Sequence, residues 1–336
     1  MDKFMEELKK TKSSVNVSLL SDETSPCVVA EWMSTGCLAL DAIMGGGLPI
    51  GRITEIYGGS SSGKSLIAAQ VAAQAQSVED RVVYVDTETA VSIEIMKMVG
   101  VDVDSLVYAN PDTIEDVFTI YEEAIKAHKK INDGKKLLLI WDSIAATSNQ
   151  AEMDNPYGKA TMGKHAQLMS QGLRKLTRYV ANEHVCCLFL NQIRKKIGVM
   201  FGDDTATFGG LALEFHTSVR VVLRSSKKIK DGKRTIGINS IATVSKNKVA
   251  VPFKSCILPI YFGHGVKDEE AAFEYLNSAG LLNRSGSYYT INTIEEAGKF
   301  IKADFNKFYD TNYDAISDLV MNTGIYAEDD DEDTIE

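Results

Sequence analysis

Long hydrophobic runs are missing from this sequence of 336 residues, although 44% of its residues are hydrophobic. No apolar stretch approaches the roughly 18 residues that cross a bilayer. Residues 1–10 are rich in Lys and Glu and lack the apolar centre of a signal peptide. We therefore expect a cytoplasmic protein without a membrane partner, long enough for one large domain and a smaller one.

Cysteine is scarce, and its five residues form neither a Cys-x-x-Cys pair nor a metal-ligand set with histidine. Cys186 and Cys187 lie inside an apolar segment, and Cys27, Cys37 and Cys256 are scattered along the chain. We interpret all five as reduced thiols that pack in the core as small hydrophobic residues.

An excess of positive charge, which is typical of nucleic-acid-binding proteins, is also absent, because the formal net charge is −10. The imbalance is local: seven of the last nine residues are acidic, and removing their charges leaves −3. Such a run is typical of a solvated, disordered tail, and a tail tethered near a basic groove would also compete with DNA. The net charge therefore does not exclude a nucleic-acid partner.

Short apolar segments alternate with longer amphipathic ones in the first two thirds of the chain. A helix is predicted from Asp112, with Glu115 completing a capping box and apolar side chains on one face. Alternating strands and helices predict an α/β fold, in which a mostly parallel central sheet is covered by helices and binds ligands at the carboxyl ends of its strands. The predicted strands are Ile53–Tyr57, Val82–Val85, Leu106–Tyr108, Leu137–Trp141 and Cys186–Leu190.

The remaining segments predict the domain organisation. Residues 1–33 form an N-terminal arm, either a cap on the main domain or a polymerisation arm that docks on a neighbouring subunit. Residues 34–264 form the core, in which antiparallel strands after residue 218 extend the sheet. Residues 265–327 form a small α+β C-terminal domain with helices near 268–279, 293–303 and 305–321, followed by the acidic tail 328–336.

A phosphate-binding loop follows the first predicted strand and opens a predicted helix over residues 66–75, which is the context that its motif G-x-x-x-x-G-K-[ST] requires. Its glycines let backbone amides surround phosphate groups. Lys64 is expected to reach the β- and γ-phosphates, and the Ser65 hydroxyl to bind Mg²⁺. The loop consists of Gly58, Gly59, Ser60, Ser61, Ser62, Gly63, Lys64 and Ser65.

Acidic residues follow two of the predicted strands. Asp142 ends the apolar strand 137–141, where a carboxylate is expected to hold the metal through water. Asp86 and Glu88 follow strand 82–85 and point to one side of an extended chain. We favour Glu88 as the base that orients the attacking water and Asp86 as a structural acid, and two solvated turn acids are the alternative.

Three stretches together resemble the RecA-type recombinases over most of residues 34–265. Residues 34–58 lead into the phosphate loop, residues 169–176 read MSQGLRKL, and residues 191–202 read NQIRKKIGVMFG. The resemblance implies a P-loop NTPase core with ATP and Mg²⁺ as cofactors. It also implies a DNA-dependent ATPase that forms helical filaments on single-stranded DNA and exchanges strands with homologous double-stranded DNA.

The resemblance also implies roles for individual residues. Glu88 activates the hydrolytic water beside Lys64, and Gln192 senses the γ-phosphate. Lys246 and Lys248 reach the nucleotide of the adjacent protomer. Cations supplied by a neighbour would make ATP bridge two subunits, so that filament assembly depends on nucleotide.

Two DNA-binding loops are implied as well, at about residues 154–163 and 193–209, on either side of a helix. Cations there can neutralise phosphates, apolar side chains can lie beside bases, and glycines let the backbone approach the strand. The sequence contains no evident base-reading helix, which predicts nearly sequence-independent binding. The expected DNA-binding residues are Met162, Gly163, Ser170, Arg174, Arg194, Lys196, Ile197, Gly209 and Gly210.

The chain departs from the family pattern at three positions. Ser92 and Ile95 stand where the family usually places an acid and a tyrosine against adenine, and Glu214 stands where bacterial members carry a lysine near the subunit interface. Base selectivity and coupling between neighbouring sites are therefore less firmly predicted than phosphate binding. A ring-forming motor or helicase on the same core, and a small-molecule kinase, are the alternative functions.

Overall fold

The computed structural model describes residues 28–156, 163–195, 205–294 and 297–324, and the statements below concern these residues. Their main element is a ten-stranded sheet with the strand order β12-β11-β10-β9-β3-β7-β6-β4-β5, in which β8 pairs with β7. The strands are β3 (Ile53–Gly58), β4 (Arg81–Asp86), β5 (Val107–Ala109), β6 (Leu137–Asp142), β7 (Val185–Lys195), β8 (Thr205–Thr207), β9 (Val219–Asp231), β10 (Arg234–Asn247), β11 (Ser255–Tyr261) and β12 (Gly265–Val266).

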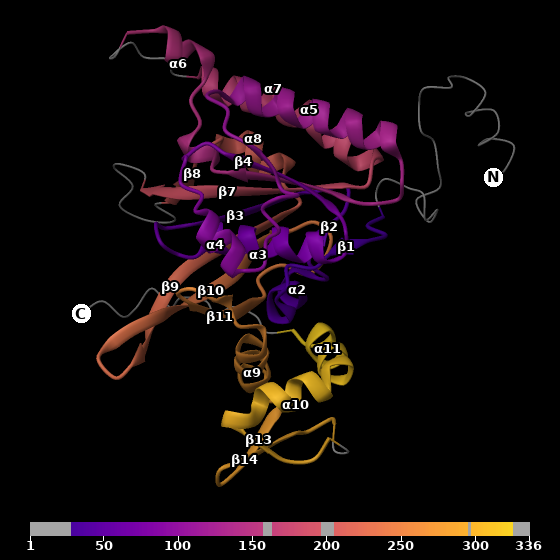
Figure 1. Cartoon of the computed structure of the whole chain (residues 1–336), viewed down its shortest axis with the longest axis vertical. Coiled ribbons are helices and arrows are strands. Elements are labelled where there is room, and N and C mark those ends of the chain that lie inside the picture. The colour runs from indigo at the N-terminus through magenta and orange to yellow at the C-terminus, as the bar shows by residue number, and fades with distance from the viewer. Residues whose placement is uncertain (1–27, 157–162, 196–204, 295–296, 325–336) are drawn as a thin grey trace, which may run out of the picture.

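The central part of this sheet is parallel and its flank is antiparallel. Strands β9, β3, β7, β6, β4 and β5 pair in parallel. Strands β9 to β12 pair antiparallel, and β9 and β10 extend beyond the sheet as a two-stranded hairpin (Figure 1). The predicted α/β fold and the antiparallel extension are confirmed.

Helices cover both faces of the sheet (Figure 1). Along β6, Leu138 and Ile140 pack in a buried cluster with α2 and α3, whereas Leu137, Leu139 and Trp141 pack with α5 and α7 on the other face. This alternation explains why β6 is apolar throughout, since a strand buried on both faces has no polar side. The helices of the core are α2 (Leu38–Met44), α3 (Lys64–Ser77), α4 (Ile93–Met98), α5 (Ile114–Ile131), α6 (Gln150–Asp154), α7 (Lys164–Asn182) and α8 (Gly210–His216).

The start of α5 differs from the prediction. Its N-cap is Thr113, whose hydroxyl accepts a hydrogen bond from the backbone N–H of Asp116, so the predicted capping pair of Asp112 and Glu115 is wrong. Two adjacent residues of the sequence can cap a helix, and Thr113 has the extended backbone that the N-cap position needs. The predicted apolar face of α5 is buried as expected.

The C-terminal part combines helices with a small sheet, but the predicted helix at 293–303 is wrong. Tyr288 and Tyr289 pair with Ile301 and Phe300 in a three-stranded antiparallel sheet, and a short 3-10 helix over Lys302–Asp304 follows. The helix predicted over 305–321 is two helices that meet at Asn312. The elements are α9 (Asp268–Ser278), β13 (Leu282–Ser285), β14 (Tyr288–Ile291), β15 (Phe300–Ile301), α10 (Phe305–Thr311) and α11 (Tyr313–Asn322).

One buried cluster runs from α2 and α3 into α9, α10 and α11, so the apolar contacts of the core continue into the C-terminal part. The proposed domain boundaries stay a prediction. Residues 1–27 of the predicted arm 1–33 and the tail 328–336 lie outside the described residues. Cys37, Cys186, Cys187 and Cys256 are buried free thiols, as expected. Among the described helices, none is both long and apolar enough to cross a membrane.

Candidate nucleotide site and nucleic-acid loops

The phosphate loop joins the end of β3 to the start of α3 and is pressed against neighbouring strands. A Cβ atom on Gly58 would lie 2.4 Å from the carbonyl oxygen of Leu223, and one on Gly63 would lie 2.4 Å from Cδ1 of Ile260. Gly63 also has a φ of +99°, which favours glycine. Close packing against backbone therefore requires glycine at position 58, and the backbone conformation favours glycine at position 63.

Lys64 begins α3, and its ammonium group lies over the loop. Its Nζ donates to the carbonyl oxygens of Gly59 at 2.7 Å and Gly58 at 3.2 Å. Burial lowers the pKa of Lys64, against the raising effect of Asp142 and Glu88. Among the described residues Lys64 forms no ion pair, which leaves its charge available to an anion.

Asp142 ends β6 beside the start of α3. Its Oδ2 accepts a hydrogen bond from the Tyr84 hydroxyl at 2.8 Å, and its carboxylate also accepts from the Ser65 hydroxyl. Burial raises the pKa of Asp142, and the bonds from Ser65 and Tyr84 oppose that shift. An acid and a hydroxyl thus lie together at the foot of the loop, as predicted for the metal pair.

Glu88 lies where three strand ends converge. Its Oε1 accepts hydrogen bonds from the Ser143 hydroxyl at 2.5 Å and from Nε2 of Gln192 at 3.0 Å. The structure therefore brings together the predicted base and the predicted phosphate sensor. The contact of Ser143 with Glu88 was not predicted from the sequence. The position of Ser143 directly after Asp142, at the carboxyl end of a strand, could have indicated that it lies near the site.

Asp86 does not enter this pocket. It is 1% exposed and accepts hydrogen bonds from the backbone N–H groups of Glu88 at 3.0 Å, Ala90 at 3.0 Å and Val91 at 3.1 Å. The Tyr108 hydroxyl donates to it at 3.1 Å. Asp86 therefore holds the segment that presents Glu88, which is a structural role.

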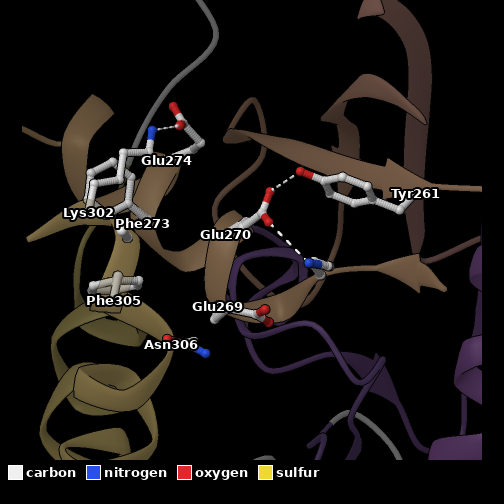
Figure 2. A pocket seen from close by; sticks show the side chains of 10 residues that line it. Tyr261, Glu269, Glu270, Phe273, Glu274, Lys302, Phe305 and Asn306 are labelled. Carbon is white, nitrogen blue, oxygen red and sulfur yellow. Dashed lines mark hydrogen bonds and ion pairs between the residues drawn. The ribbon is translucent and has the colours of Figure 1, made fainter. Parts of the chain in front are cut away.

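The phosphate cavity has a volume of about 220 Å³ and is lined by Glu88, Asp142, Gln192 and residues 60–66. A larger cleft of about 490 Å³ lies between β11, α9 and α10 (Figure 2). There Glu270 accepts from the Tyr261 hydroxyl at 2.7 Å and pairs with Lys267 at 3.4 Å, and Glu274 pairs with Lys302 at 3.0 Å. Both lysines of the cleft are paired with its glutamates, whereas no ion pair among the described residues joins the charged groups of the smaller cavity.

Lys246 and Lys248 lie away from the phosphate cavity of their own chain. Lys246 Nζ donates to the carbonyl oxygen of Glu214, and Lys248 Nζ donates to that of Phe215 at 2.7 Å. Both cations thus cap the C-terminal end of α8. Burial, together with the charges of Lys248 and Arg220, lowers the pKa of Lys246 to about 8.

The predicted DNA-binding residues are placed in part. Gly163 precedes α7, on which Arg174 donates to the Ser170 hydroxyl at 2.7 Å. The ends of loop 193–209 form an antiparallel pair, β7 with β8, and the Arg194 guanidinium lies 3.3 Å from the centre of the Phe208 ring. Met162, Lys196 and Ile197 lie outside the described residues.

Gly209 and Gly210 close that loop at the start of α8. Their φ angles of +87° and +59° fall in the left-handed region that favours glycine. Gln192 and Arg194 lie on β7, the strand that leads into the second predicted loop, and both line a cavity with Glu88 and Phe208. The structure therefore brings the second loop close to the nucleotide cavity in sequence and in space.

A strand, a glycine loop and a helix that opens on a lysine, with acids at the ends of two neighbouring strands, define a P-loop nucleotide-hydrolysing protein. The family model of the RecA N-terminal domain matches residues 1–267. The chain therefore belongs to the RecA family. The curated relatives support the same assignment over most of their length.

Three relatives illustrate the similarity, each with the name Protein RecA. That of Geobacter sulfurreducens is 41% identical over 271 residues, which cover 80% of this chain and 78% of the relative. That of Heliobacterium modesticaldum is 40% identical over 269 residues, or 80% and 76% of the two chains. That of Saccharopolyspora erythraea is 37% identical over 314 residues, or 93% and 88%.

Family membership confirms the predicted activity. The chain is a DNA-dependent ATPase and homologous recombinase of recombinational repair. The same match decides against the ring motor and the small-molecule kinase as alternatives.

Proposed function

We propose that this chain binds ATP with Mg²⁺ in the cavity below residues 58–65, assembles on single-stranded DNA into helical filaments, and pairs that strand with homologous double-stranded DNA. The observation that carries the proposal is the position of Gln192. Its side chain contacts Glu88 in the cavity, and the next residue along the chain begins the predicted DNA-binding loop.

In this proposal the loop amides and Lys64 hold the β- and γ-phosphates. The carboxylate of Glu88 accepts a proton from the attacking water, and Ser143 holds that carboxylate in place through its hydroxyl. Gln192 leaves Glu88 for the γ-phosphate when ATP is bound. This exchange of partners gives loop 193–209 one arrangement with ATP and another without it.

The residues beside the loop fit a magnesium ion. Mg²⁺ prefers hard oxygen ligands and keeps several waters, and the Ser65 hydroxyl with the buried Asp142 carboxylate offers such a set. Ser65 would bind the ion directly and Asp142 through water. The bound ion would neutralise phosphate charge near the bond that breaks.

Lys246 and Lys248 act on the nucleotide of a neighbouring protomer in this proposal. Their ammonium groups donate to backbone carbonyl oxygens at the end of α8, and a phosphate can replace these bonds at little cost. Two cations from a second chain would then complete the ATP site. Filament assembly becomes dependent on ATP for that reason.

The DNA strand is proposed to lie between residues 154–163, α7 and loop 193–209. Arg174 and Arg194 supply cations there, and the expected contacts of Gly163, Ser170, Gly209 and Gly210 lie on the same elements. Phosphate contacts with apolar side chains between them predict sequence-independent binding whose affinity falls with salt.

Measurement of ATP turnover with and without single-stranded DNA, combined with electron microscopy, tests this function. We expect turnover to rise with DNA and helical filaments to form on DNA when a non-hydrolysable ATP analogue is present. Closed rings that are indifferent to DNA would support a motor instead. Turnover unaffected by DNA would contradict the proposal.

A further inference from the structure

Glu55 is a buried charge in the middle of the sheet, three residues before the phosphate loop. Its side chain is 0% exposed, and its neighbours across the sheet are Phe189 on β7 and Arg220 on β9. Burying a carboxylate is costly unless every lone pair finds a donor. The hydrogen-bond partners of Glu55 therefore indicate the structural role of its carboxylate.

The first oxygen of Glu55 connects to the start and the end of loop 193–209. Its Oε1 accepts a hydrogen bond from Nδ2 of Asn191 at 2.8 Å, and the same amide nitrogen donates to the carbonyl oxygen of Phe208 at 2.8 Å. The Oδ1 of Asn191 accepts from the backbone N–H of Gln192 at 2.9 Å. All three polar groups of the Asn191 amide thus join β3, Gln192 and the closing end of the loop.

The second oxygen reaches the same end of the loop by another route. Its Oε2 accepts from Nε of Arg220 at 2.5 Å, and a terminal nitrogen of Arg220 donates to the Thr207 hydroxyl at 3.0 Å. The guanidinium also lies 4.7 Å from the centre of the Tyr57 ring, which follows Glu55 on β3. Arg220 is therefore held by the strand that leads into the phosphate loop.

Glu55 is thus bonded through two intermediates, Asn191 and Arg220, to two consecutive residues of the loop end. Burial raises the pKa of Glu55, and the charge and hydrogen bond of Arg220 and the hydrogen bond from Asn191 oppose that shift. A charged hydrogen-bond network in a low-dielectric interior is stiff, since each broken bond leaves a buried polar group unsatisfied.

We propose that Glu55 is the positioning residue that ties the closing end of loop 193–209 to the phosphate-loop strand, so that the nucleotide state sets the DNA affinity of the loop through Asn191 and Arg220. This inference rests on the proposed function, because it takes loop 193–209 as the DNA-binding loop. Glu55 does not line the phosphate cavity.

Glu55→Gln tests the proposal. Glutamine keeps an oxygen for Asn191 and the volume of the side chain, but it removes the charge and places an amide N–H against Arg220. The measurement is the dissociation constant of a fluorescein-labelled oligothymidylate, in the presence of ADP and of ATPγS. We expect the ratio of the dissociation constant with ADP to that with ATPγS to be at least about 10-fold smaller in Glu55→Gln than in the wild-type protein. Binding of a fluorescent ATP analogue is expected to change by less than about 2-fold.

Two more variants keep the test decisive. Thr207→Val removes the acceptor of Arg220 at the loop end without changing the side-chain shape, and we expect it to lower the ratio part of the way. Glu79→Gln is the matched control, because Glu79 pairs with Lys135 at 3.1 Å from an exposed position outside the connection between β3 and loop 193–209. We expect its ratio to stay at the wild-type value.

Wild-type ratios in Glu55→Gln and Thr207→Val would overturn the proposal. If Glu55→Gln does not fold by circular dichroism, Thr207→Val alone decides, and an unchanged ratio again overturns it. A ratio of 1 in the wild-type protein is a different failure, since it would overturn the proposed function of the nucleotide cavity itself.

Discussion

Two of the cavities among the described residues differ in how their charged side chains are paired, and the difference does not follow their volumes. The cleft between β11, α9 and α10 is about twice as large as the phosphate cavity, but its lysines are paired with its own glutamates (Figure 2). In the smaller cavity Lys64 holds backbone carbonyls, and Glu88 accepts from uncharged donors. Charged groups without an ion pair around one cavity therefore favour the smaller cavity as the proposed nucleotide site, although its volume is smaller.

Replacement of Lys64 in the phosphate cavity is expected to have the largest effect. Lys64→Ala removes the ammonium group at the start of α3 that is proposed to hold the phosphates. We therefore expect ATP-dependent strand exchange to be abolished. A strand-exchange assay with homologous duplex DNA measures this. Lys302→Ala in the larger cleft is the control and is expected to exchange normally. Normal exchange by Lys64→Ala would mean that the two cavities do not differ in function.

Replacement of Glu88, the proposed base, is expected to have the second largest effect. Glu88→Gln keeps the hydrogen bond from Ser143 to an oxygen but cannot accept a proton, so turnover should fall by at least about 10²-fold with nucleotide binding largely intact. Steady-state hydrolysis and equilibrium binding of a fluorescent ATP analogue separate the two effects. Glu94→Gln, on the exposed start of α4, is the matched control. Undiminished turnover would remove Glu88 from its role.

The proposed contact of Lys246 with a neighbouring protomer predicts a pH dependence of self-association. The pKa of Lys246 is lowered to about 8 by burial, Lys248 and Arg220, against the raising effect of Glu214 and Glu55. Above that pH the free lysine is neutral and must take up a proton to bind a neighbour's phosphate. We therefore expect ATP-dependent self-association to weaken by up to about tenfold per pH unit above the pKa.

Lys246→Arg separates this effect from general alkaline weakening. An arginine stays protonated throughout this range, so self-association of the variant should depend less on pH. Sedimentation with ATPγS between neutral and alkaline pH provides the measurement. Identical pH profiles for the two proteins would count against a charged Lys246 at the subunit contact.

The nucleotide cavity could be predicted from the sequence because its signals are local. The glycine loop, Lys64, Asp142 and Glu88 each follow an apolar strand, and the carboxyl ends of parallel strands meet at one edge. The network of Glu55 could not be predicted in this way. Its partners Asn191 and Arg220 are 136 and 165 residues away, and only the sheet order brings them together.

The errors in the predicted fold also arise from contacts between residues that are distant in the sequence. The predicted helix at 293–303 contains Phe300 and Ile301, which pair with β14 instead, and such pairing is not visible in helical periodicity. The cap of α5 moved by one residue because Thr113 and Asp112 are both good N-cap residues. Both errors lie where a local pattern has two solutions and tertiary contacts select one.

The smallest effect is expected in the larger cleft, where it completes the comparison. Lys302 is 60% exposed, pairs with Glu274 at 3.0 Å and lies 4.3 Å from the centre of the Phe273 ring. Exposed pairs of this kind contribute little, so Lys302→Ala should lower the free energy of unfolding by less than about 1 kcal/mol and leave DNA-dependent ATP turnover unchanged. Urea denaturation and a turnover assay measure both. A loss of turnover in a fully folded Lys302→Ala protein would show that a cavity with paired charges can still be part of the ATPase.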